Sequence, residues 1–105
     1  MNALDAVKVA SALRDDATKT LAEASAAETA ADEQVQRAQQ EHFVAKQAHD
    51  ASASEGAAIA ESAAGAALAR ARRLHEAAKQ RTADARGALS VRDASLARTM
   101  KGWPV

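Results

Sequence analysis

Alanine occupies 32 of the 105 positions of this chain, whereas the larger apolar residues (Val, Leu, Ile, Met, Phe and Trp) together occupy only 18. Alanine is the strongest helix former because its side chain loses no rotamer freedom in a helix, but it buries little surface when it packs. We therefore expect a chain that is helical almost throughout and that lacks the bulk for a thick globular core. Such a chain is suited to close packing against another helix.

A fold-back is expected near the middle of the chain. The only proline is Pro104, close to the C-terminus, and between Asn2 and Met100 only three glycines interrupt the helix formers. Ser52 and Glu55 have the spacing of a capping box, and Gly56 adds backbone freedom. The sequence predicts an all-α, antiparallel, coiled-coil-like hairpin of two helices. Its expected parts are a helix over 1–51, a turn over 52–56, a helix over 57–101 and a tail over 102–105.

Two other architectures remain open at this stage. Serine and glycine also occur inside helices. An alternative fold is therefore a single long helix within an oligomer. A third possibility adds a break at Gly87, because Ser90 and Asp93 also have capping-box spacing.

The distribution of charge favours the hairpin. The chain has no net charge, but residues 1–50 carry five basic and nine acidic side chains and residues 51–105 carry the reverse. Two antiparallel helices of opposite sign would neutralise each other. With a turn centred near residue 54, facing residues should have numbers that add to about 108. The pairs expected from this register are Asp16 with Arg92, Glu23 with Arg86, Glu28 with Arg81, and Phe43 with Gly65.

Apolar spacing predicts which residues form the contact between the helices. In the first half the spacing is close to a heptad, interrupted by Glu28 and His42. In the second half, spacings of four and seven alternate from Ala63 to Met100, which indicates an eleven-residue repeat. The predicted seam residues are Leu13, Leu21, Val35, Phe43, Gly65, Leu74, Leu89, Leu96 and Met100.

The sequence points away from catalysis and from metal or cofactor binding. Cysteine is absent, and no nucleophile or phosphate-loop motif is present. His42 and His49 are seven residues apart, about 10 Å along a helix, which is too far for two ligands of one ion. We expect no catalytic residue, metal, cofactor or small-molecule substrate.

Two segments are candidates for contact with a partner. Arg72, Lys79 and Arg86 recur every seven residues and offer a basic surface for nucleic acid. No aromatic residue is interleaved with them for base stacking, so nucleic acid is the less favoured partner. Trp103 and Val105 follow the expected helix end, and tryptophan is enriched at interface hot spots. This tail either packs against the start of the first helix or anchors a partner.

The favoured interpretation is a non-enzymatic structural or assembly protein. It would act through helix packing, with protein partners or by self-association, as a subunit or accessory rod of a bacterial, phage or secretion-type assembly. The N-terminus has no signal-peptide pattern and no stretch is long enough to span a membrane, so we expect a cytoplasmic location or one within an assembly. In being antiparallel, charged and rich in Ala and Gln, the expected hairpin resembles the stalk proteins of flagellar and type III secretion systems. That resemblance implies an export-apparatus stalk as an alternative. A third is a nucleic-acid-binding helical module that acts through the basic segment from Arg70 to Arg86.

Overall fold

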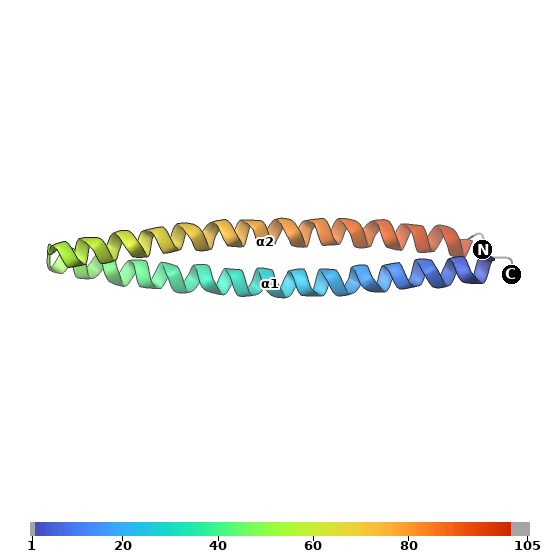
Figure 1. The fold of residues 1–105 in the computed structure, drawn as a ribbon, viewed down its shortest axis with the longest axis horizontal. Helices are drawn as coiled ribbons and strands as arrows, with labels where there is room; N and C mark the ends of the chain where they lie inside the picture. Colours follow the sequence, from blue (N-terminus) through green and yellow to red (C-terminus); the bar gives the residue numbers. More distant parts are fainter. Residues whose placement is uncertain (1, 102–105) are drawn as a thin grey trace. The chain divides into compact units, whose positions relative to one another are not determined.

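The chain forms two long antiparallel helices joined by a short turn (Figure 1). The structure is a computed structural model that describes residues 2–101. Helix α1 runs over Ala3–Ala51 and helix α2 over Glu55–Lys101. The predicted hairpin is therefore confirmed, and the single continuous helix is excluded. Helix α2 also passes through Gly87 without interruption, which excludes the additional break.

The helix ends carry the polar groups that a helix terminus requires. Asn2 caps α1, because its side-chain Oδ1 accepts a hydrogen bond of 2.8 Å from the backbone N–H of Asp5. The acidic Asp5 lies in the first turn of α1, and Arg98 and Lys101 lie in the last turn of α2. These charges have the signs that the helix dipole favours at each end.

The turn is shorter than predicted, and its capping residue is different. Helix α2 begins at Glu55, so Gly56 belongs to the helix rather than to the turn. The cap is Ser54, whose Oγ accepts a hydrogen bond of 3.1 Å from the backbone N–H of Ala57. The predicted cap, Ser52, instead contributes its carbonyl oxygen, which accepts a 2.7 Å bond from the N–H of Ser54. Three residues are thus enough to reverse the chain.

This difference gives a direct test of the turn. Ser54→Ala removes the acceptor for the first-turn N–H of α2, and we expect it to lower the free energy of unfolding by about 1 kcal/mol. Ser52→Ala is the matched control, because only its main chain takes part in the turn bonds described here. Urea unfolding followed by circular dichroism measures both values. A larger loss for Ser52→Ala than for Ser54→Ala would show that Ser52, not Ser54, caps α2.

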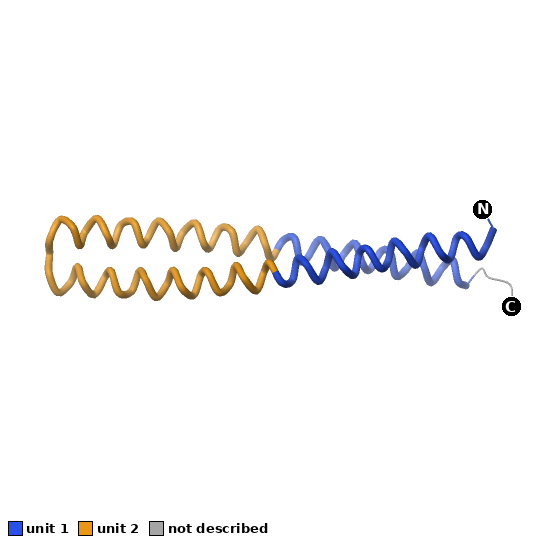
Figure 2. The backbone as a smooth tube through the Cα atoms, turned by 60° about the horizontal axis from the view of Figure 1, so that its bottom comes forward, with its two compact units in different colours: residues 1–26, 80–105 blue, residues 27–79 orange. Residues whose placement is uncertain are grey.

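The hairpin divides into two compact units, which are coloured separately in Figure 2. Unit 1 combines residues 1–26 with 80–105, and unit 2 consists of residues 27–79. In unit 2 the core is a cluster of Val35, Ala38 and Leu68, with Ala71 packed against it. In unit 1 the buried residues include Ala10, Thr82 and Ala85. Each core is one side chain thick, as the alanine content predicts.

Contacts between the helices establish the register. Within the two units, facing positions are Arg14 and Asp93, Ala24 and Thr82, Asp32 and His75, His42 and Gly65, and His49 and Glu61. The residue numbers in these pairs add to between 106 and 110, which agrees with the predicted value of about 108. The midpoint turn thus places the two helices in the register that the sequence indicated.

Both helices use heptad spacing for their seam, meaning the line of residues that each turns toward the other. Along α1 the seam residues, spaced alternately by four and three, are Ala17, Leu21, Ala24, Glu28, Ala31, Val35, Ala38, His42, Ala45 and His49. Along α2 the equivalent residues are Glu61, Ala64, Leu68, Ala71, His75, Ala78, Thr82, Ala85 and Leu89. The predicted eleven-residue repeat of the second half is therefore wrong.

Candidate functional site

The predicted seam residues fall into two groups. Val35 is buried, and Leu21, Gly65, Leu89 and Leu96 are half-buried. The other four lie outside the seam and are exposed: Leu13 at 38%, Phe43 at 55%, Leu74 at 64% and Met100 at 52%. These four residues are corrections to the sequence-based prediction. They leave large apolar side chains on the flanks of the seam rather than within it.

Phe43 illustrates how the prediction failed. The residue beside Gly65 is His42: a Cβ built on Gly65 would lie 3.5 Å from the His42 ring nitrogen Nε2, an ordinary contact distance. Successive helical residues are about 100° apart around the axis, so Phe43 points away from the seam when His42 points into it. Gly65 therefore lies beside an imidazole ring, not a phenyl ring.

Polar side chains in the seam of unit 2 pair across the two helices. His49 and Glu61 are joined by a hydrogen bond between Nδ1 and Oε2, and His75 Nε2 lies 3.8 Å from Asp32 Oδ1. Asp32, His75 and Glu28 also line a small open groove of about 240 Å³. Among residues 2–101, no group of three or more His, Asp or Glu side chains has the arrangement needed to hold a metal ion. These residues set polar contacts between the helices.

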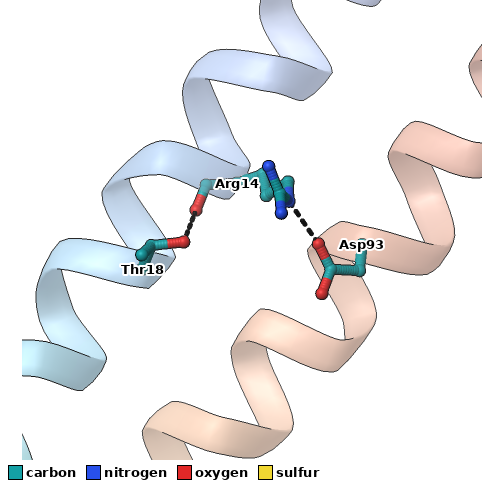
Figure 3. Close-up of polar contacts among 3 residues, drawn as sticks. All are labelled: Arg14, Thr18 and Asp93. Carbon is teal, nitrogen blue, oxygen red and sulfur yellow. Dashed lines mark hydrogen bonds and ion pairs between the residues drawn. The ribbon is translucent and has the colours of Figure 1, made fainter.

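A cross-helix ion pair in unit 1 differs from those expected. The Arg14 guanidinium donates from Nε to Oδ1 of Asp93, and the Thr18 hydroxyl donates to the Arg14 carbonyl oxygen at 3.0 Å (Figure 3). The basic partner is thus on the acidic helix and the acidic partner on the basic one. Within residues 2–101, the three pairs predicted from the register make no ion pair within 4.0 Å: Asp16–Arg92, Glu23–Arg86 and Glu28–Arg81.

Each unit carries an open groove on one flank of its seam. In unit 2 the groove has a volume of about 350 Å³ and is lined by Ala30, Ala31, Gln34, Ala67, Arg70, Ala71 and Leu74. In unit 1 it has a volume of about 210 Å³ and is lined by Leu13, Asp16, Ala17, Thr20, Ala85, Ala88 and Arg92. Alanine is the most frequent residue in each lining, and one arginine lies in each. We call them the unit 2 groove and the unit 1 groove.

The grooves contain two of the residues that the seam prediction misplaced. Leu74 lines the unit 2 groove and Leu13 lines the unit 1 groove. In α2 the seven-residue spacing of Ala67 and Leu74 places them on the same flank of the seam. The apolar residues that suggested an eleven-residue repeat, from Ala63 to Met100, lie partly on this flank and partly in the seam. Their average spacing is therefore longer than that of the residues that make the contact.

The predicted basic surface is exposed. Arg72, Lys79 and Arg86 all lie on α2 with exposed side chains, one heptad apart. The Lys79 ammonium lies 3.9 Å from Oε1 of Glu76 on the same helix. The predicted anchor residues, Trp103 and Val105, lie outside the described residues.

Comparisons with known proteins give no information about the function of this chain. No protein-family model matches the chain, and neither a curated protein nor a solved structure matches it significantly. Within the part of the chain that is described, neither helix has an apolar stretch suitable for crossing a membrane.

Proposed function

We propose that this chain is a non-enzymatic structural protein that acts by packing its helices against other protein helices in an assembly. One observation carries the proposal: the seam is too thin to cover the apolar side chains that the chain contains. Among the described residues, the exposed large apolar side chains range from 38% exposure at Leu13 to 64% at Leu74. Two of these side chains, Leu13 and Leu74, line open grooves beside the seam, where a partner helix could cover them.

The composition of the exposed flanks is also suited to this role. Alanine is the most frequent residue in both groove linings, and its small side chain allows a partner helix to approach closely. Bacterial, phage or secretion-type assemblies are the settings that we expected from the sequence. An assembly subunit is preferred over a stalk that acts as a free hairpin, because a free hairpin would leave the exposed apolar residues uncovered.

Sedimentation velocity and thermal unfolding over a wide range of protein concentration test this proposal. We expect the sedimenting mass to increase with concentration and the unfolding temperature to rise with it, because association stabilises the folded state by mass action. A chain that remains monomeric at every concentration, with an unchanged unfolding temperature, would contradict assembly through its own surfaces. The measurement requires no knowledge of the final assembly.

A further inference from the structure

The unit 1 groove combines apolar and charged groups in a self-complementary arrangement. Its lining includes Leu13 and Asp16 from α1 and Arg92 from α2. Val9 precedes Leu13 by one helical turn and extends the apolar area on α1, with 47% of its surface exposed. On α2 the apolar lining consists of Ala85 and Ala88. Each helix therefore brings both an apolar side chain and a charge to the same groove, and the two charges are opposite.

We propose that the unit 1 groove binds the same groove of a second copy of this chain, so that Asp16 of each copy lies against Arg92 of the other. The inference rests on the proposed function and names the partner for one surface. A two-fold symmetric interface requires a patch that is complementary to itself. A patch with one acidic and one basic helix meets this requirement when α1 of one copy lies over α2 of the other.

The charges select this arrangement over its alternative. If α1 lay over α1 of the second copy, the two Asp16 carboxylates would approach each other, and like charges at an interface are strongly unfavourable. The wider distribution agrees, since residues 1–50 have five basic and nine acidic side chains and residues 51–105 have nine and five. Asp16 and Arg92 line one groove but make no ion pair among residues 2–101, so both charges are available to a partner.

The interface would cover the exposed side chains of Val9 and Leu13, which are 47% and 38% exposed.

A charge-reversal mixing experiment tests the proposal. Asp16→Arg and Arg92→Asp are each prepared in the full chain, and association is measured by sedimentation at low ionic strength. Each variant alone places like charges opposite each other twice in a homodimer, and we expect its dimer dissociation constant to rise at least about tenfold. In an equimolar mixture, one chain is basic at both groove positions and the other is acidic at both, so every charge in the interface meets its opposite. The mixture should therefore recover a dissociation constant within about threefold of the unmodified protein.

Mixing separates contacts between copies from contacts within a chain. Each variant has the same internal repulsion whether its partner is identical or complementary, so an effect within the chain cannot be relieved by mixing. The matched control is Glu33→Arg mixed with Arg73→Asp, which makes the same changes in net charge at exposed positions outside the groove. These control variants should associate separately as well as they do together.

The outcomes distinguish this proposal from the broader one. If the unmodified chain does not associate with itself, both assembly by self-association and this dimer are contradicted. If it associates but the two groove variants associate equally well, or mixing fails to restore them, the groove does not bind a second copy in this way. Equal rescue in the control mixture would attribute the effect to net charge and also overturn the proposal. If a reversal variant loses its helical circular dichroism, Asp16→Asn and Arg92→Gln replace the pair, and each must then weaken association about two- to threefold.

Discussion

Leu68→Ala is expected to lower the free energy of unfolding by about 2–3 kcal/mol, whereas Leu74→Ala should change it by less than about 1 kcal/mol. Both residues are leucines of α2 in unit 2. Leu68 is 7% exposed and belongs to the cluster with Val35 and Ala38. Leu74 is 64% exposed and lines the flank groove. The pair therefore compares the same chemical change inside and outside the seam.

The size of the Leu68 effect follows from the thinness of the core. Truncation removes the transfer free energy of the buried methyl and methylene groups and leaves a cavity whose surroundings relax only partly. The cluster that surrounds Leu68 consists of Val35 and Ala38, with Ala71 packed against it, and alanine side chains cannot extend into the space. We expect a destabilisation in the lower part of the usual range for Leu→Ala, because the two helices can move closer together and reduce the cavity.

Urea unfolding followed by far-ultraviolet circular dichroism, at one fixed protein concentration, gives both values. The fixed concentration matters because self-association would otherwise add a mass-action contribution to stability. If Leu74→Ala cost as much as Leu68→Ala, the contact line of α2 would follow the eleven-residue spacing instead of the heptad. The measurement thus tests the main point on which sequence and structure differ.

That difference has a physical origin in the polar residues of the α2 seam. The α2 seam repeats every seven residues at Leu68, His75, Thr82 and Leu89, with an alanine between each pair. The two polar members, His75 and Thr82, interrupt the apolar pattern. A search for apolar residues alone passes over them and takes Leu74 instead. In a Leu-rich helix the seam would stand out by bulk, but here alanine occurs on every face. The apolar pattern of the sequence is therefore compatible with more than one contact line, although the helices pack along only one.

Features set by local chemistry were easier to predict. The hairpin and its register follow from helix propensity together with a serine-rich midpoint, and Asn2 caps the first helix as its side chain allows. In α1 the heptad was visible because Leu21 and Val35 differ in bulk from the alanines between them. The grooves were not predictable, because their linings depend on which flank residues of the two helices meet. Spacing along one helix carries no such information.

Thr82→Leu is expected to lower the free energy of unfolding by about 1–3 kcal/mol through overpacking. Thr82 is 1% exposed, the lowest value among the buried residues described, and its hydroxyl donates a 3.2 Å hydrogen bond to the carbonyl oxygen of Ala24. A side-chain atom of α2 thus touches the backbone of α1. The seam neighbours Ala78 and Ala85 are also buried, which indicates that the helices approach closely here.

Thr82→Val separates the hydroxyl from the shape of the side chain. Valine has nearly the same volume, so this variant should lose the net contribution of the hydroxyl's hydrogen bonding, about 1 kcal/mol. Ala83→Leu adds a leucine at the next position, which is exposed, and should leave stability within about 0.5 kcal/mol of the unmodified chain. Unfolding by urea ranks the three variants. An increase in stability for Thr82→Leu would mean that the seam has room for a larger side chain and that the contact with Ala24 does not fix the helix spacing. A larger loss for Thr82→Leu than for the other two variants would show that small side chains are required at this position for the two backbones to meet. The alanine content would then be a packing requirement as well as a helix preference.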